Sequence, residues 1–144
     1  LNSYRRLKPG THAPTSLCWG YENRTASIRV PGGMSENTRI EHRVAGADAN
    51  PYLVAATILA ATLDGIQKKI KAPDPVTGDS YTHNFEKIPS DWKTAIDTFR
   101  SGNLNKIFFS DIFIEVFSNL KLQEMRTFSD RMEDFEVGTY LDHI

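Results

Sequence analysis

Several features that usually guide a functional interpretation are scarce in this sequence. Cys18 is the only cysteine among 144 residues, so no internal disulfide can stabilise the chain. It lies in the apolar stretch SLCWGY, which favours a small packed side chain over a reactive thiol. No apolar run approaches the roughly 20 residues that a membrane-spanning helix needs, and no signal peptide is visible. We therefore expect a cytoplasmic protein with no membrane partner.

An excess of charge of one sign and the common nucleotide-binding motifs are missing as well. The formal net charge is −1, which gives no reason to expect a nucleic acid as partner. The sequence has no GxxxxGK[ST] loop, no GxGxxG after a strand and no HExxH. Binding of a nucleotide or a metal would therefore have to depend on other residues.

The first third of the chain is rich in arginine. Residues 1–44 contain six arginines and three glutamates, whereas the last part of the chain is more acidic. The composition of the whole chain hides this concentration. With 40% hydrophobic residues, the sequence is sufficient for one compact domain with a core.

The alternation of polar and apolar residues predicts three short strands within residues 15–44, in TSLCWGY, TASIRV and RIEHRV. A long helix is expected over about residues 51–71, with Asn50 as its N-cap and Pro51 in its first turn. A loop, APDPVTGDS, and further helices follow. The predicted fold is α+β, with short antiparallel strands packed on the long helix and on the C-terminal helices.

The strand RIEHRV carries the most informative local pattern. Its period of two places Arg39, Glu41 and Arg43 on one face. A solvated face of alternating charge is sufficient to explain this strand alone. The preceding strand, however, presents Arg29 on its polar face, and Arg24 lies just before it. If these strands pair, several guanidinium groups and one carboxylate converge on one surface.

A convergent arginine surface suits carboxylates and phosphates, because the planar guanidinium donates two hydrogen bonds to two oxygens. Positive charge nearby lowers the pKa of a glutamate, so Glu41 should stay ionised and suit a hard cation such as Mg2+. The pattern thus indicates phosphoryl transfer. One glutamate cannot hold the metal alone, so further ligands are expected elsewhere, and the chain is expected to be a fragment.

Four segments, NSYRRLKPG, ENRTASIRVP, RIEHR and DANPYLVAATILAATLDGI, occur in this order. Together they resemble the C-terminal catalytic region of the glutamine synthetase family, over residues 2 to about 70. The resemblance implies that residues 1–144 are the C-terminal part of the catalytic domain, without its N-terminal β-grasp domain and upstream catalytic strands. It also implies a homo-oligomeric double ring with active sites between subunits, and no activity for this fragment alone.

The family joins the side-chain carboxyl of glutamate to an amine. ATP first phosphorylates the carboxylate, and the amine then displaces phosphate from the γ-glutamyl phosphate. By resemblance, Arg24 and His12 are catalytic, and Arg24 lies near both the transferred phosphoryl group and glutamate, so it is also expected to bind the nucleotide and glutamate. The other matched positions are Arg6 and Arg43 for glutamate, Arg29 and Arg39 for the nucleotide, and Glu41 for Mg2+ or Mn2+.

Two positions depart from the family pattern. His12 stands where ammonia-using members carry an acidic residue in a loop over the amine site, and a neutral histidine can accept a proton near pH 7. This favours the branch that uses larger amines, such as γ-glutamylputrescine and γ-glutamylpolyamine synthetases. Glu36 stands where many relatives have a lysine near the nucleotide, or is misaligned. The alternatives are an ammonia-using glutamine synthetase and a non-catalytic structural relative.

Overall fold

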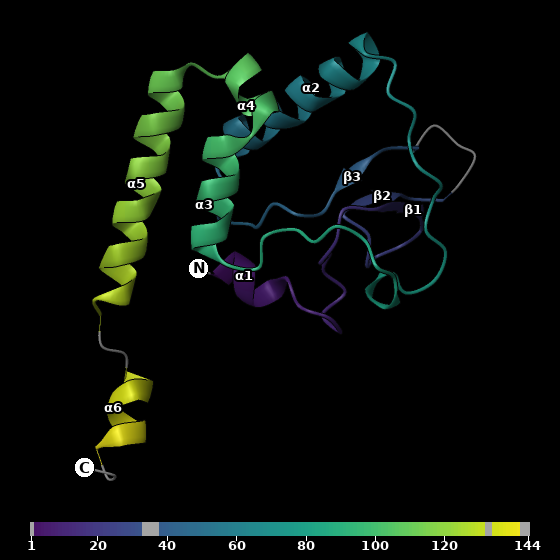
Figure 1. Cartoon of the computed structure of the whole chain (residues 1–144). Helices are drawn as coiled ribbons and strands as arrows, with labels where there is room; N and C mark the ends of the chain where they lie inside the picture. Colours follow the sequence, from purple (N-terminus) through teal and green to yellow (C-terminus); the bar gives the residue numbers. More distant parts are fainter. Residues whose placement is uncertain (1, 33–37, 132–133, 142–144) are drawn as a thin grey trace. The chain divides into compact units, whose positions relative to one another are not determined.

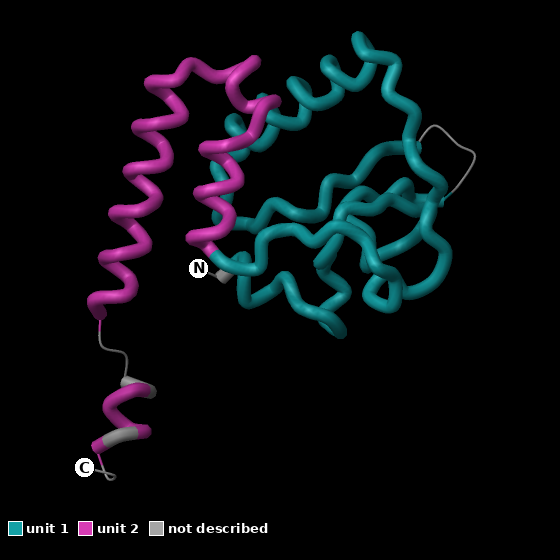
Figure 2. Tube along the Cα trace, in the orientation of Figure 1, with its two compact units in different colours: residues 1–91 teal, residues 92–144 magenta. Residues whose placement is uncertain are grey.

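The computed structural model describes residues 2–32, 38–131 and 134–141, and the chain divides into two compact units, residues 1–91 and 92–144 (Figure 2). Unit 1 contains α1 (Asn2–Arg6), β1 (Trp19–Tyr21), β2 (Ile28–Val30), β3 (Glu41–His42), α2 (Pro51–Gln67) and the 3-10 helix η1 (Ser80–Thr82). Unit 2 contains α3 (Trp92–Ser101), α4 (Asn103–Phe108), α5 (Asp111–Ser129) and α6 (Asp134–Tyr140). Within the described ranges, no helix has the length and apolar character that a membrane span requires.

The three strands form one small sheet in the order β1-β2-β3 (Figure 1). The pairing of β2 with β3 is antiparallel, as the sequence predicts, and it places Arg29 opposite Glu41. The pairing of β1 with β2 is parallel, which differs from the predicted antiparallel sheet. The reason lies in the connection, because Asn23 accepts hydrogen bonds from the backbone and hydroxyl of Thr25 at 3.0 and 2.8 Å. Residues 22–27 therefore make a wide loop instead of a hairpin turn.

A segment from later in the chain, residues 73–88, extends along the outer side of β1. Val76 donates its N–H to the carbonyl of Trp19 at 2.8 Å, and Leu17 donates to Glu86 at 2.8 Å. This segment satisfies backbone groups that would otherwise be unpaired at the edge of the sheet.

The apolar core of unit 1 is small. Leu7, Ala13 and Ile88 form it, and Tyr4 and Val44 pack against it. The core therefore joins the N-terminal segment to the end of the segment 73–88, and it holds the loop around residue 12 from one side.

Helix α2 begins as the sequence predicts. The Asn50 side chain accepts hydrogen bonds from the backbone of Tyr52 at 3.0 Å and of Leu53 at 3.3 Å, and Pro51 is the first helical residue. The helix ends at Gln67, before the predicted end near residue 71.

The early end of α2 is a Schellman motif without glycine. Lys69 has a φ of 51° and donates its N–H to Ile66 at 3.1 Å, while Ile70 donates to Gly65 at 2.9 Å. A left-handed lysine is uncommon, so the residue types there do not signal this end.

The apolar stripe of α2 is exposed, and none of its residues is buried. Leu59, Leu63 and Ile66 are 68%, 46% and 70% exposed. The predicted packing of the sheet on α2 is therefore not seen in this structure, in which the stripe stays open to solvent.

In unit 2, α3 and α5 lie side by side and run in opposite directions, with α4 between them in the chain (Figure 1). Ser110 caps α5 by accepting a hydrogen bond from the backbone of Phe113 at 3.2 Å. Phenylalanine rings join the two helices, since the ring centroids of Phe99 in α3 and Phe117 in α5 lie 5.3 Å apart. Within α5, the rings of Phe113 and Phe117 stack with centroids 5.7 Å apart.

Replacing Ser118 in α5 with alanine should stabilise unit 2. The Ser118 side chain is 1% exposed, and its hydroxyl has no hydrogen-bond partner among the described residues. Removing an unpaired buried hydroxyl, in a helix that favours alanine, should raise the free energy of unfolding by about 1 kcal/mol. Urea unfolding followed by circular dichroism measures this. Ser129→Ala is the control, because the Ser129 hydroxyl already donates to Met125 at 3.0 Å. An equal or lower stability of Ser118→Ala would contradict the prediction.

Candidate active site

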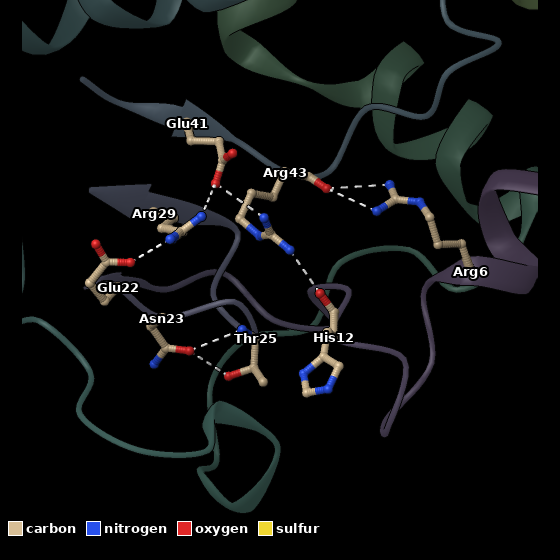
Figure 3. A network of polar contacts seen from close by, with 8 residues as sticks. All are labelled: Arg6, His12, Glu22, Asn23, Thr25, Arg29, Glu41 and Arg43. Carbon is tan, nitrogen blue, oxygen red and sulfur yellow. Dashed lines mark hydrogen bonds and ion pairs between the residues drawn. The ribbon is translucent and has the colours of Figure 1, made fainter. Parts of the chain in front are cut away.

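Four charged side chains form a network across the sheet, which we call the charged cluster: Arg29, Arg43, Glu22 and Glu41 (Figure 3). Glu41 Oε2 accepts from Arg29 Nη1 at 3.3 Å and from Arg43 Nη1 at 3.1 Å. The other carboxylate, Glu22, binds Arg29 Nη2 and also the backbone N–H of Gly32.

The local sequence explains most of this cluster. The register of β2 on β3 sets Arg29 opposite Glu41, and the extended chain places Arg43 beside Glu41. The predicted convergence of these three residues is confirmed. Glu22 was not predicted, because its approach to Arg29 follows from the parallel pairing of β1 with β2. Its backbone donates to Val30 at 3.0 Å and has a φ of 49°.

Hydrogen bonds to arginine hold both carboxylates in their ionised form. Arg43, and after it Arg29, lowers the pKa of Glu41 below its ordinary value, as the sequence predicts. Arg29 and then the N–H of Gly32 lower the pKa of Glu22. The pKa of Arg29 is raised in turn, chiefly by Glu22. The cluster therefore carries two positive and two negative charges at neutral pH.

In the part of the chain that the structure describes, one donor group of each arginine in the charged cluster has no partner. The Nε groups of Arg29 and Arg43 are buried and have no acceptor among the described residues. A buried N–H without a partner is costly, but these two are closed to solvent, so a carboxylate or phosphate oxygen would reach them only if neighbouring side chains moved. The Arg29 and Arg43 side chains are 16% and 18% exposed, and this exposed part suits an anionic ligand.

The loop of residues 8–14, which we call the His12 loop, is attached directly to the charged cluster. Arg43 Nη2 donates to the carbonyl of His12 at 2.8 Å. His12 has a φ of 53°, a left-handed conformation that is uncommon outside glycine. Its imidazole points away from the charged cluster (Figure 3).

On that side, His12 lines an open pocket of about 930 Å³, which we call the His12 pocket. Arg24, which is exposed, also lines it, so two of the predicted site residues face one space. Rings contribute to the wall through Tyr21 and Tyr81, and carboxylates through Glu22 and Asp79. This pocket could not be predicted from the sequence, because its lining includes residues of the later loop 75–81.

Arg6 lies apart from the charged cluster. Its guanidinium donates to the backbone carbonyl of Arg43 at 3.2 and 3.3 Å (Figure 3). It also donates to the carbonyl of Val44 at 2.7 Å. In this structure Arg6 therefore holds the backbone that carries Arg43. Arg39 is exposed and precedes β3. Glu36 lies outside the described residues.

The described residues include no group of three histidine, cysteine, aspartate or glutamate side chains placed to hold a metal. Glu41 is ionised, so it fits as one oxygen ligand of a hard cation. Such a cation takes about six oxygen ligands, and Glu41 would be one of several.

Comparison with known proteins decides the family. Residues 1–140 match the family model described as "Glutamine synthetase, catalytic domain". The chain belongs to the glutamine synthetase family. The resemblance seen in the sequence is thereby confirmed, and the match extends well beyond residue 70.

Curated members of the glutamine synthetase family with different names are similar to this chain to the same degree. Gamma-glutamylethanolamide synthetase GlnA4 of Streptomyces coelicolor is 36% identical, over 95% of this chain and 29% of its own length. Gamma-glutamylputrescine synthetase PuuA of Escherichia coli is 35% identical, over 95% and 29%. A glutamine synthetase of Methanocaldococcus jannaschii is 36% identical, over 98% and 33%. The chain thus spans about a third of the length of these relatives.

Solved structures of the glutamine synthetase family support the α+β fold class. The structure titled "Apo GmaS without ligand" matches with a TM-score of 0.78 and 28% identity, over 98% of this chain and 32% of that chain. The structure titled "GmaS/ADP complex-Conformation 1" matches with a TM-score of 0.76 and 26% identity, over 93% and 31%.

The charged cluster should stabilise the protein only while its carboxylates are ionised. The folded-state pKa values of Glu22 and Glu41 lie below 4.5, so their contribution is complete above pH 4.5 and is lost as the pH falls through those values. Arg29→Gln should therefore lower the urea midpoint at neutral pH, and the difference from wild type should narrow in acid.

Urea titrations at several pH values measure this effect. Arg5→Gln is the matched control, because Arg5 is exposed on α1 and outside the cluster, and it should change the midpoint little at any pH. A difference between Arg29→Gln and wild type that is independent of pH would contradict the prediction.

Proposed function

We propose that this chain is the C-terminal part of the catalytic domain of an ATP-dependent glutamate–amine ligase. The observation that carries the proposal is the attachment of the His12 loop to the charged cluster through Arg43. An anion-binding surface and a basic side chain, His12, are thus fixed to each other by one guanidinium group. The family membership and the names of the relatives support the same reaction class.

The proposed reaction has two steps. An oxygen of the glutamate γ-carboxylate attacks the terminal phosphorus of ATP, and ADP leaves. The amine nitrogen then attacks the carbonyl carbon of the γ-glutamyl phosphate, phosphate leaves with the electron pair of the broken bond, and the nitrogen loses a proton. Fixed guanidinium groups suit both steps, because negative charge develops on phosphate oxygens in each step.

We assign roles to the described residues on this basis. Arg24 faces the His12 pocket and would bind the transferred phosphoryl group, and Arg43 would bind glutamate. Arg29, with Arg39, would contact the nucleotide, and Glu41 would hold Mg2+ or Mn2+, which neutralises phosphate charge when bound. The binding of glutamate by Arg6 stays a prediction, since its guanidinium contacts the backbone of residues 43–45.

The remaining question about this reaction is which amine serves as the substrate. The relatives at similar identity include a synthetase named for ethanolamide, one for putrescine and several glutamine synthetases. We favour an organic amine such as putrescine, another polyamine or a small alkylamine, because His12 supplies no fixed negative charge. In its neutral form His12 can take the proton that the amine nitrogen loses.

The remaining parts of the proposal follow from the family. The partners would be glutamate, ATP and a small amine, in a cytoplasmic homo-oligomer built as a double ring. The chain spans about a third of the length of its relatives, and we expect residues 1–144 to be inactive by themselves.

Phosphate release by the full-length enzyme tests the proposal. With glutamate and ATP present, we expect release to depend on an organic amine, with a kcat/KM for the best amine at least about tenfold above that for ammonium. Putrescine, ethanolamine, isopropylamine and ammonium form the panel, and omission of glutamate is the control. Release with ammonium but with none of the organic amines would exclude the amine preference, and no release with any of them would exclude the ligase.

His12→Glu should shift the selectivity toward ammonium. A fixed carboxylate attracts a small cation and removes its proton, so the ratio of kcat/KM for ammonium to that for the organic amine should rise about tenfold or more. His83→Glu is the matched control, because His83 is exposed and lies outside the His12 pocket. An unchanged ratio in His12→Glu would remove His12 from the amine site.

A further inference from the structure

Two neighbouring carbonyls of the His12 loop are held by side chains from different parts of unit 1. Arg43 Nη2 donates to the carbonyl of His12 at 2.8 Å, and the phenolic hydroxyl of Tyr81 donates to the carbonyl of Ala13 at 2.7 Å. Ala13 is only 2% exposed, so the Tyr81 hydroxyl pairs a carbonyl with little access to water. These two bonds can hold His12 in its left-handed conformation.

Tyr81 is itself held by contacts of η1 with the loop between β1 and β2. It belongs to η1, where its N–H donates to Asp79 Oδ1 at 2.9 Å. The preceding residue, Ser80, is fully buried and donates two hydrogen bonds to Thr25, from its N–H to the Thr25 hydroxyl at 2.9 Å and from its hydroxyl to the Thr25 carbonyl at 2.8 Å. Tyr81 is thereby linked to the residue that follows Arg24.

The rest of the loop 75–81 is clamped to the same turn. The buried amide of Asn23 donates to the carbonyls of Gly78 at 2.9 Å and of Val76 at 3.2 Å. Gly20 permits this close approach, because a Cβ at that position would lie 2.5 Å from the Val76 carbonyl oxygen. The loop 75–81 is therefore a fixed wall, and it moves only if these contacts break.

This wall borders the His12 pocket. The loop contributes Pro75, Val76 and Tyr81 to the lining, and Tyr21 adds a second ring from β1. Ammonia has no apolar surface to bury against such groups, whereas an alkylamine or a diamine has a carbon chain.

We propose that the loop 75–81 receives the organic substituent of the amine, and that Tyr81 is the positioning residue that fixes the His12 loop beside it. This inference rests on the proposed amine ligation. It adds a specificity-determining wall from a segment whose sequence predicts only a loop.

Tyr81→Phe tests the positioning role, because it keeps the ring and removes only the hydroxyl. In the full-length protein, hydrogen exchange at the amides of residues 11–13 should quicken about fivefold, the factor expected for one lost hydrogen bond. The KM for the organic amine should rise by about the same factor, with the KM values for ATP and glutamate unchanged. Tyr52→Phe, at an 83% exposed position on α2, is the matched control. Unchanged exchange, or an unchanged KM for the amine, would overturn the positioning role.

Thr77→Trp tests the wall, because Thr77 is exposed and lines the His12 pocket. A bulky ring there should lower kcat/KM about tenfold for putrescine and isopropylamine, and much less for methylamine or ammonium. Thr82→Trp is the control, since Thr82 is exposed at the end of η1 but is not part of the lining. An equal decrease in kcat/KM for all amines, or no decrease for any of them, would contradict the proposal that the loop 75–81 receives the organic substituent.

The outcomes separate this inference from the function on which it rests. If wild-type enzyme ligates no amine, both the proposed ligase function and the amine-binding role of the loop 75–81 are excluded. Hydrogen exchange in Tyr81→Phe still reports whether Tyr81 fixes the His12 loop. If wild-type enzyme ligates organic amines and Thr77→Trp keeps their relative rates, the ligase stands and the wall is wrong.

Discussion

The guanidinium group of Arg43 is the interaction on which the candidate site depends. One of its nitrogens binds Glu41 on the sheet, and another binds the carbonyl of His12. Its own backbone carbonyl accepts from Arg6, so the residue is held at both ends. The link is geometric as well as electrostatic, because a planar fork with fixed donors sets the direction of each partner. A lysine would supply the charge without this direction, and the His12 loop would then be attached less precisely.

Hydrogen bonds of polar side chains help to hold the loops of unit 1 in place. Its strands have only two or three residues each, and its apolar core is a small cluster around Leu7, Ala13 and Ile88. A loop beside such a core cannot depend on burial alone, and the buried amide of Asn23 and the hydroxyl of Tyr81 supply fixed bonds instead. Removing one member of a buried polar network lowers the stability of the protein, because its partner is left without a hydrogen bond. This explains how an exposed loop with a left-handed residue can keep a defined shape.

The sequence predicts those parts of the site that depend on neighbours along a strand. The alternation in RIEHRV is sufficient to bring Glu41 beside Arg43, and the antiparallel register adds Arg29. The sequence also signals the start of α2, because Asn50 and Pro51 are good capping residues. The contact of Glu22 with Arg29 could not be predicted, since it depends on the unexpected parallel pairing of β1 with β2. The position of the loop 75–81 could not be predicted either, since it depends on contacts with residues far earlier in the chain and has no periodic pattern. The end of α2 was missed for a local reason, a left-handed lysine where glycine is usual.

The backbone conformation at position 12 restricts which side chains can stand there. A φ of 53° disfavours most side chains and is tolerated better by histidine, asparagine and aspartate than by glutamate. Replacing His12 with glutamate would therefore add backbone strain as well as negative charge, and the loop could shift away from the carbonyl contacts that hold it. Histidine at position 12 thus fits the left-handed backbone of the loop, and the contacts of Arg43 and Tyr81 with the His12 and Ala13 carbonyls hold that backbone in place.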